Sequence, residues 1–451
     1  MRIVIVGVGK VGASIAQQLS LEGHDIYIID KNPRVVESTM NILDGIGVVG
    51  NGACLESQTE AETGKSDLLI AATASDETNL LCCLLAKKLG SKHTIARVRN
   101  HEYREQLKLL KEDLGLSFCI NPELFTAQEI SRILRFPVAL KVDNFVKGTI
   151  ELVEYKISED SPLVGLPLSA LYQKYKVKVL ICAVERGEEA IIPNGDFVLG
   201  QGDRIHITAS PSQIAAFFKE IGTIKQKIKS VMIIGGGKIS FYLSKILIAM
   251  GMQVKIIEKD TKRCDELSCL VPEAMIINGD GTDAELLSEE GMDTTDAFVS
   301  LTGMDEENII ISMFANNNKV KKVVTKINRQ SYVEIMENVN LGSIVTPKEI
   351  TTDHILRYVR AMRNSWDSKV ETLYRIADNK AEVLEFQIKD EAKFTSISLK
   401  VLQLKKNTLI AAIYRKGRVI IPGGEDTIEA GDNVVVVTGQ SGIRAIEHIL
   451  E

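Results

Sequence analysis

Short apolar runs alternate with amphipathic stretches along the first part of the chain. Runs rich in isoleucine and valine predict buried strands at Arg2–Val6, Asp25–Ile29, Ile46–Val49, Leu68–Ala72 and Thr94–Val98. Stretches 12–23, 32–43 and 79–90 carry apolar residues at helical spacing, and the last two end at or near a glycine. Because continuous apolar strands that alternate with helices are typical of parallel sheets, the pattern predicts a doubly wound α/β fold.

This pattern occurs twice in the chain. Gly7 aligns with Gly235 and Asp30 with Glu258, each at an offset of 228 positions. "TASDETNLL" at 73–81 aligns with "TGMDEENII" at 302–310, near an offset of 229, and we align Asn51-Gly52 with Asn278-Gly279 at 227. Offsets that drift so little over a hundred positions indicate a duplicated domain.

A second kind of segment follows each copy. Phe136-Pro137 ends a predicted helix that begins near Pro122, because proline disfavours helical geometry in the residue before it. Short strands and turns follow, and "IIPNGDFVLGQGD" at 191–203 recurs as "IIPGGEDTIEAGD" at 420–432. We therefore expect two Rossmann-like domains at 1–137 and 225–358, and two small α+β modules at 138–224 and 359–451, with a polar link at 225–230.

Composition narrows the functional class. The 451 residues carry a formal charge of −6 and 45% hydrophobic residues, which argues against a nucleic-acid partner, since such proteins need a basic face. Charges interrupt the apolar stretches well before the roughly 20 residues that a membrane span needs. Seven scattered cysteines without a CxxC pair indicate reduced thiols and no metal site. We expect a soluble cytoplasmic protein.

The string "GVGKVG" at 7–12 lies between a predicted strand and a predicted helix, the context that makes such a glycine motif informative. Gly7 allows a tight turn, Gly9 leaves room for a pyrophosphate, and Gly12 lets the helix pack on the strand. Phosphates would face free N–H groups at the helix N-terminus. Asp30, 18 residues after Gly12, can accept hydrogen bonds from ribose hydroxyls and repel a 2′-phosphate. The motif favours NAD or an adenosine phosphate over NADP.

The second copy, "GGGKIS" at 235–240, keeps two of the three glycines. Gly235 and Gly237 remain, Ser240 takes the third place, and Glu258 again follows 18 residues later. The copy predicts a second nucleotide site, although a glycine turn without a ligand remains the alternative.

Polar residues after the fourth predicted strand of each half are further candidates. Thr73-Ala74 and Thr302-Gly303 lie at the carboxyl edge, where ligands of such sheets bind. They can line the adenine or ribose side, but an ordinary helix cap accounts for them equally well.

Cations near the same edge can reach phosphates. Arg97 ends the fifth predicted strand, with Arg99 beside it, and Lys326 matches Arg97 in the second copy. Arg97 and Arg99 are the candidates for sensing a terminal phosphate, and a salt bridge is the alternative. Lys10 and Lys238, in the turns, can contact phosphate or remain solvated.

Residues suited to catalysis are not recognisable in this pattern. A dehydrogenase needs a proton donor or acceptor beside the nicotinamide, often histidine, and the six histidines here are scattered. The sequence has no HExxH motif, Walker lysine or nucleophile elbow. We therefore expect a nucleotide sensor that is not an enzyme. An NAD-dependent oxidoreductase with a duplicated Rossmann fold is the alternative.

Several motifs together resemble the TrkA family of Trk potassium-uptake systems. They are "MRIVIVGVGKVG", "IID", "SDETNLLCCLLAKKLG", "IARVRN" and the paired Ile-Ile-Pro-x-Gly turns, and the resemblance covers essentially the whole chain. It implies a cytosolic regulatory subunit of two tandem RCK domains, each a KTN domain followed by a TrkA-C module. NAD(H), ATP or ADP would change the shape of a gating ring formed by a homo-oligomer, a tetramer. The implied partner is an integral-membrane potassium transporter subunit of the TrkH/TrkG kind, at the inner face of the cell membrane.

The resemblance also carries the family's nucleotide-binding residues onto two matching sets. The first comprises Gly7, Val8, Gly9, Lys10, Val11, Asp30, Thr73, Ala74 and Arg97. The second comprises Gly235, Gly236, Gly237, Lys238, Ile239, Glu258, Thr302, Gly303 and Lys326. Two positions depart from the family pattern: Asn51 stands where an aspartate is common, and Lys326 replaces the arginine of the first copy. Both departures leave the ligand of each site open, especially the second.

Overall fold

The structure, a computed structural model, describes residues 1–103, 106–107, 113–136, 141–187, 189–223, 228–336, 341–367, 370–377, 380–389, 391–392, 394–440, 443 and 445–451. They form two compact units: unit one comprises 1–131 and 229–356, and unit two comprises 132–228 and 357–451. The expected domain boundaries at 137/138 and 224/225, and residues 225–227 of the link, lie outside the described residues. No helix among those described is long and apolar enough to cross a membrane.

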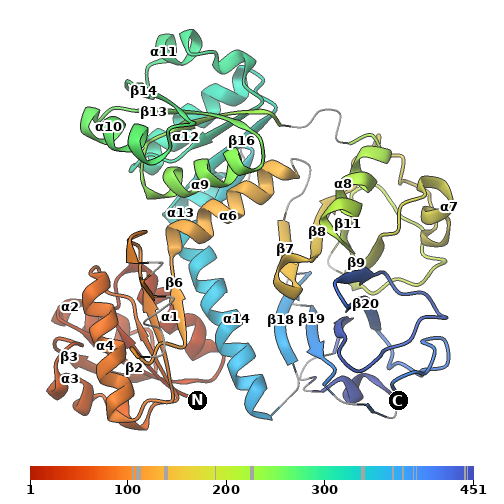
Figure 1. Cartoon of the computed structure of the whole chain (residues 1–451), viewed down its shortest axis with the longest axis horizontal. Coiled ribbons are helices and arrows are strands. Elements are labelled where there is room, and N and C mark those ends of the chain that lie inside the picture. The colour runs from red at the N-terminus through yellow and green to blue at the C-terminus, as the bar shows by residue number, and fades with distance from the viewer. Residues whose placement is uncertain are drawn as a thin grey trace. The chain divides into compact units, whose positions relative to one another are not determined.

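The first half of unit one, red to orange in Figure 1, is built on a six-stranded parallel sheet. Its strand order is β3-β2-β1-β4-β5-β6. The order changes direction between β1 and β4, which is the topological switch point of a Rossmann fold. The predicted doubly wound sheet is thus confirmed, but the sequence pattern missed the sixth strand. The strands are β1 (Arg2–Val6), β2 (Asp25–Asp30), β3 (Gly45–Val49), β4 (Leu68–Ala71), β5 (His93–Arg97) and β6 (Phe118–Ile120).

Local capping explains where the helices of this half begin and end. Asn32 caps α2 by accepting a hydrogen bond from the Arg34 N–H, and Ser75 caps α4 in the same way. Gly90, at a φ of 116°, ends α4 in the left-handed conformation. The helices are α1 (Lys10–Leu21), α2 (Pro33–Met40), α3 (Leu55–Glu60), the short 3₁₀ helix η1 (Thr63–Lys65), α4 (Asp76–Leu89) and α6 (Pro122–Arg135).

The second half of unit one repeats this architecture, with the strand order β14-β13-β12-β15-β16-β17. Its strands are β12 (Ser230–Ile234), β13 (Gln253–Glu258), β14 (Met275–Asn278), β15 (Ala297–Ser300), β16 (Lys322–Lys326) and β17 (Ser343–Val345). Its helices are α9 (Lys238–Ala249), α10 (Thr261–Leu270), α11 (Ala284–Glu289), η4 (Met292–Thr294), α12 (Asp305–Asn317), α13 (Gln330–Met336) and α14 (Pro347–Asp367). The expected boundary at 358/359 falls inside α14.

Strand register corrects one part of the repeat alignment. Asp30 pairs with Val49 across β2 and β3, whereas Glu258 pairs with Asn278 across β13 and β14. Asn278 is therefore the counterpart of Val49, and the alignment of Asn51 with Asn278 was wrong by two residues. Two turns that each contain Asn-Gly misled the sequence comparison.

The glycines after these strands confirm the corrected register. A Cβ added to Gly52 or to Gly281 would lie 2.1 Å from a side-chain carbon of the central strand of its own half. The two glycines thus occupy equivalent places, which makes Asp280 the counterpart of Asn51. The second half therefore has the aspartate that the first half lacks.

Segments after the sixth strands join the two halves of unit one. Thr352 of α14 donates a hydrogen bond to Ser14 of α1, with 3.4 Å between the hydroxyl oxygens. Asn121, just before α6, donates to the Tyr242 hydroxyl of α9 at 3.0 Å. Each half therefore contacts the helix or helix entry that follows the sheet of the other half.

Unit two contains two five-stranded sheets with the orders β10-β9-β11-β8-β7 and β18-β19-β22-β20-β21. One apolar cluster includes Ile150 and Cys182 from the first sheet and Val383 and Ala412 from the second, so the two sheets share a core. The strands are β7 (Lys141–Phe145), β8 (Ile150–Lys156), β9 (Leu180–Arg186), β10 (Glu189–Ile191), β11 (Arg204–Ala209), β18 (Val370–Ile376), β19 (Ala381–Gln387), β20 (Thr408–Arg415), β21 (Arg418–Ile420) and β22 (Asn433–Thr438), with helices α7 (Leu171–Tyr175) and α8 (Pro211–Glu220).

The repeated glycine–aspartate turn of unit two is held by an ion pair between a buried aspartate and an arginine that is half exposed. Arg186 donates from Nε and Nη2 to the two carboxylate oxygens of Asp203 at 2.9 and 2.8 Å, and the Gly200 N–H adds a bond of 2.8 Å. In the second sheet, Arg415 likewise donates from Nε and Nη2 to the two carboxylate oxygens of Asp432. Burial by itself raises the pKa of Asp203, but the bonds from Arg186 and Gly200 outweigh it, so the pKa lies below its usual value.

Asp203→Asn is expected to lower the free energy of unfolding by about 1–3 kcal/mol at pH 7, because Arg186 loses a charged partner. A carboxyl whose pKa is depressed by folding stabilises above its unfolded pKa of about 3.9 and loses this effect as pH falls through the folded pKa. The deficit should therefore shrink toward pH 3 in urea unfolding followed by circular dichroism. Asp196→Asn, at an exposed position in the same turn, is the control, and equal effects of the two variants at pH 7 would contradict this account.

Candidate functional site

The glycine turn between β1 and α1 combines two crowded positions with one open position. Gly7 has a φ of +85°, and a Cβ there would lie 2.8 Å from the Thr73 backbone nitrogen. A Cβ on Gly12 would lie 2.0 Å from the Gly7 carbonyl oxygen. Gly9, in contrast, would direct a Cβ into space with no heavy atom within 4 Å. The fold requires Gly7 and Gly12, and Gly9 leaves the mouth of the turn open to a phosphate group.

Asp30 braces this turn from the end of β2. Its Oδ2 accepts a hydrogen bond from the Val8 N–H at 2.9 Å, and its Oδ1 accepts one from the Asn32 N–H at 2.9 Å. Each carboxylate oxygen keeps capacity for a further donor, such as a ribose hydroxyl. Lys10 and Val11 are the first residues of α1, and Lys10 is exposed beside the turn.

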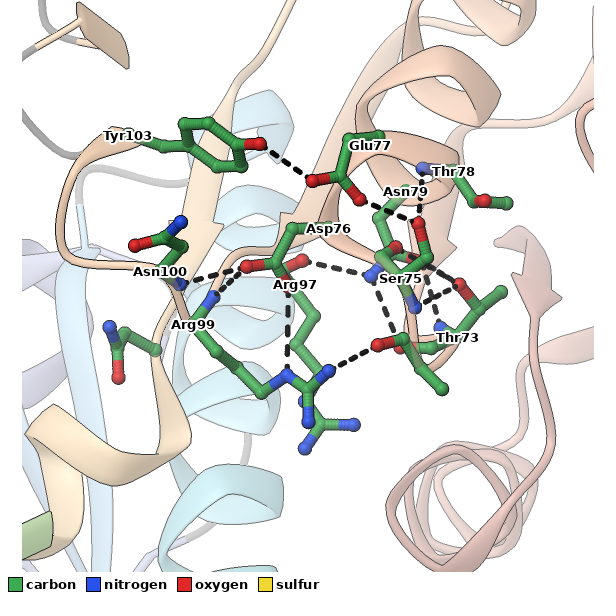
Figure 2. A network of polar contacts seen from close by, with 12 residues as sticks. Thr73, Ser75, Asp76, Glu77, Thr78, Asn79, Arg97, Arg99, Asn100 and Tyr103 are labelled. Carbon is green, nitrogen blue, oxygen red and sulfur yellow. Dashed lines mark hydrogen bonds and ion pairs between the residues drawn. The ribbon is translucent and has the colours of Figure 1, made fainter. Parts of the chain in front are cut away.

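A buried asparagine ties the ends of β4 and β5 together. Asn79 is fully buried; its Oδ1 accepts from the Thr73 N–H at 2.8 Å and from the Thr73 hydroxyl at 2.7 Å (Figure 2). Its Nδ2 donates to the Arg97 carbonyl at 2.8 Å. The sequence pattern did not reveal this contact between Asn79 and the two strand ends. The signal was the recurrence of asparagine at Asn308 in the second copy.

Two guanidinium groups lie beside each other at the same edge (Figure 2). Arg99 is fixed by Asp76, which accepts from the Arg99 and Asn100 N–H groups at 2.8 Å each, and its Nη2 donates to the Ala74 carbonyl. Arg97 has a buried Nε without a hydrogen-bond partner among the described residues. Burial and the neighbouring Arg99 both lower the pKa of Arg97. A bound anion would satisfy this donor and offset the repulsion between the two cations.

Glu77 lies at the rim of this edge and stays charged. The Tyr103 hydroxyl donates to its Oε1 at 2.6 Å and the Ser75 hydroxyl to its Oε2 at 2.8 Å. These bonds, the one from Tyr103 foremost, lower the pKa of Glu77 to about 2. Glu306 and Tyr332 repeat the contact at 2.9 Å in the second half.

The second glycine turn reproduces the geometry of the first with different residues. Gly235 has a φ of +95°, and a Cβ on Gly237 would again meet no heavy atom within 4 Å. Glu258 accepts from the Gly236 N–H at 2.5 Å and from the Asp260 N–H at 2.8 Å, as Asp30 does in the first half. Ser240 donates its hydroxyl to the Gly235 carbonyl. Lys238 and Ile239 open α9.

In the second half, the lysine that corresponds to Arg97 bonds to the protein's own backbone. Asn308 accepts from the Thr302 N–H at 2.8 Å and donates to the Lys326 carbonyl at 3.0 Å, so the asparagine tie is kept. The Lys326 ammonium, however, donates to the Thr302 carbonyl at 2.5 Å, and burial lowers the pKa of Lys326. Asn328 stands where the first half has Arg99. Gly303 follows Thr302, and a Cβ there would meet no heavy atom within 4 Å.

The two halves also differ in charge at the residues that follow their third strands. Asn51 is neutral and accepts from the Ala53 N–H at 3.2 Å. Asp280, its counterpart, accepts from the Thr282 N–H at 2.9 Å and hydroxyl at 2.8 Å, and these bonds lower its pKa. The first edge has two adjacent guanidinium groups, whereas the second has an extra carboxylate. The first edge is therefore the better receptor for a highly charged anion.

A cleft of about 580 Å³ in unit one is lined by residues of both halves. The first half contributes residues 74–77 and 99–102, and the second contributes Lys238, Phe241, Tyr242 and Arg263, among others. Arg263 donates from Nε to the Gly236 carbonyl at 2.7 Å, which ties α10 to the second glycine turn. The described residues contain no group of three or more side chains suited to hold a metal ion.

Two family models match most of the chain. The TrkA-N domain model matches residues 3–122 and 231–347, and the TrkA-C domain model matches residues 152–222 and 383–451. A protein of Archaeoglobus fulgidus named Trk system potassium uptake protein TrkA homolog is 33% identical over 449 residues, covering 100% of both chains. The TrkA protein of Haemophilus influenzae is 30% identical and covers 100% of this chain and 99% of its own. The chain belongs to the TrkA family.

Solved structures show the same fold as this TrkA-family chain. The GsuK channel has a TM-score of 0.65 at 16% identity, covering 97% of this chain and 76% of that chain. A GsuK channel structure described as bound to NAD has a TM-score of 0.63 with the same coverage. The likeness at this identity concerns the fold, and it extends over both Rossmann-like halves and both small modules.

Gly12→Ala is expected to destabilise the first half by about 3 kcal/mol, because the methyl group would overlap the Gly7 carbonyl. Gly9→Ala should change the stability by less than about 0.5 kcal/mol, since Gly9 has a φ of −66° and open space around it. Urea unfolding of both variants measures the difference. A Gly9→Ala variant as unstable as Gly12→Ala would show that the turn is packed differently.

Proposed function

We propose that this chain is a cytosolic, nucleotide-binding regulatory subunit that gates a potassium uptake channel or transporter. The observation that carries the proposal is the pair of open glycine turns, each braced by an acid at the end of the next strand, in a member of the TrkA family. We propose a division into domains 1–137, 138–224, 225–358 and 359–451. The TrkA-N and TrkA-C matches fall within these four segments.

The proposed ligands are NAD(H) and the adenosine phosphates ATP and ADP. The proposed site residues of the first half are Gly7–Val11, Asp30, Thr73, Ala74 and Arg97. Those of the second half are their counterparts Gly235–Ile239, Glu258, Thr302, Gly303 and Lys326. The NAD named with the GsuK channel, which shares this fold, supports a dinucleotide at such an edge. The unpaired Nε of Arg97 and the open space at Gly9 support an anion at the first site.

The first site is the proposed sensor of phosphate charge. A ligand shifts a conformational equilibrium only by the difference in its affinity for the two states. A terminal phosphate held by Arg97 and Arg99 would face Lys238 and Arg263 across the shared cleft. ATP and ADP would then favour different arrangements of the two halves, and the small modules would carry this change onward.

The proposed partner is an integral-membrane potassium transporter subunit of the TrkH/TrkG kind, met at the inner face of the cell membrane by a homotetramer. The two relatives described above are named as Trk potassium uptake proteins, which supports a transport partner. The comparisons do not favour the alternative of an NAD-dependent oxidoreductase. We propose that the chain binds its nucleotides without consuming them.

Asp30→Ala is expected to weaken nucleotide binding at the first site about tenfold or more, and Glu258→Ala to do so at the second, because each removes the ribose acceptor and a brace of the turn. Calorimetric titration of the whole protein with NAD, NADH, ATP and ADP measures both. Each variant is the control for the other, since each leaves one site intact. Titrations unaltered by both substitutions would remove the two-site proposal.

Arg99→Ala is expected to reduce the preference for ATP over ADP, because it deletes one of two adjacent cations near the terminal phosphate. Arg329→Ala is the matched control, since Arg329 is a surface residue that pairs with Glu306 at 2.7 Å in the second half. Competition binding of ATP and ADP gives the ratio of affinities. An unchanged ratio in Arg99→Ala would argue against Arg99 as a phosphate sensor.

A further inference from the structure

A second cavity, of about 490 Å³, lies at the edge of the second parallel sheet that faces away from the glycine turn. It is lined by the amino ends of β12 and β13, the start of β14 and the segment around η4. We call it the amino-edge pocket. The residues that characterise it are Met252, Lys255, Glu273, Met275, Glu290 and Thr294. None of them belongs to either proposed nucleotide site.

The first half fills the corresponding place with its own side chains. Arg2 donates to Glu62 at 2.5 Å, and its guanidinium lies 5.0 Å from the centre of the Tyr27 ring. This stack covers the amino ends of β1 and β2. A charged planar group, its carboxylate and an aromatic ring thus occupy the space.

Three substitutions in the repeat remove this stack from the second half. Val4 pairs with Tyr27 and Met232 pairs with Lys255 in the parallel ladders, so Lys255 is the counterpart of Tyr27. Ser230, the first residue of β12, replaces the arginine at the start of β1. Gly291 replaces the glutamate, since both precede the 3₁₀ helix and have positive φ. The pocket therefore lies where the first half has the side chains of Arg2, Glu62 and Tyr27.

The walls of the amino-edge pocket carry both signs of charge. The Lys255 ammonium donates to the Glu290 carbonyl at 2.6 Å and to its carboxylate at 2.8 Å. An ammonium has three donors, so one remains without a partner among the described residues. Glu273 is exposed, and no hydrogen bond or ion pair involves it within the described part of the chain. Met252 and Met275 supply adaptable apolar surface.

We infer that the amino-edge pocket binds a small zwitterion of the amino-acid class with an apolar side chain. The ligand carboxylate accepts the free N–H of Lys255, its ammonium faces Glu273, and its side chain lies against the two methionines. A pure anion is disfavoured by the two glutamates, and a pure cation by the lysine. The volume falls within the range of about 300–1,000 Å³ that small-molecule sites occupy. The inference does not depend on nucleotide binding.

Calorimetric titration of the full-length protein with leucine and methionine tests the pocket, with leucinamide and 4-methylpentanoate as probes that each lack one charge. We expect leucine or methionine to bind, and loss of either charge to weaken binding about tenfold or more. Absence of binding by both amino acids up to about 10 mM overturns the inference. So does equal binding of the probes and leucine.

Two variants locate the site. Ser230→Arg with Gly291→Glu restores the arginine and the glutamate of the first half, and Glu62, at a φ of 51°, shows that this backbone accepts glutamate. The refilled variant should lose amino-acid binding and keep its nucleotide titrations. Lys255→Met should weaken amino-acid binding about tenfold or more without rebuilding the pocket, and it decides the matter if the refilled variant does not fold. Unaltered amino-acid affinity in a folded variant places the binding elsewhere and overturns the inference.

Discussion

One buried amide in each half holds the edge on which the nucleotide proposal depends. Asn79 and Asn308 each accept from the N–H after one central strand and donate to the carbonyl at the end of the next. Both amides are fully buried, so each lost bond would leave a polar group without water. Separating the two strand ends therefore costs free energy, and Thr73 and Arg97 keep a fixed spacing. The glycine turn packs against this fixed edge rather than against a mobile loop.

The same frame supports two different electrostatic environments. In the first half the last residue of the fifth strand, Arg97, is an arginine whose buried Nε has no hydrogen-bond partner among the described residues. In the second half the lysine at that position donates to a backbone carbonyl and becomes part of the framework. A guanidinium cannot lose its proton and has a fixed set of donors, whereas an ammonium turns easily toward nearby carbonyls. The change from Arg97 to Lys326 thus replaces a side chain that can receive an anion by one that makes a structural contact.

Local sequence patterns predicted the parts of this molecule that local physics determines. The glycine turns, the central strands and Asp30 depend on residues close in the sequence, and the structure brings them together. Strand β6 was missed because three residues are too few for a pattern, and its place depends on pairing with β5. The match of Asn51 with Asn278 failed because similar letters outweighed strand register. The direction of the Lys326 side chain could not be predicted, since it depends on burial beneath the adjacent turn.

The contacts between Thr352 and Ser14 and between Asn121 and Tyr242 have an evolutionary consequence. If the two halves were separate, identical subunits with the same contacts, one gene would encode both. Any substitution would then appear in both subunits. Joining the copies in one polypeptide removes that restriction while these contacts keep them together. Mutation can then alter one copy while the other stays unchanged. In this way Lys326 and the amino-edge pocket can arise in only one of the two copies.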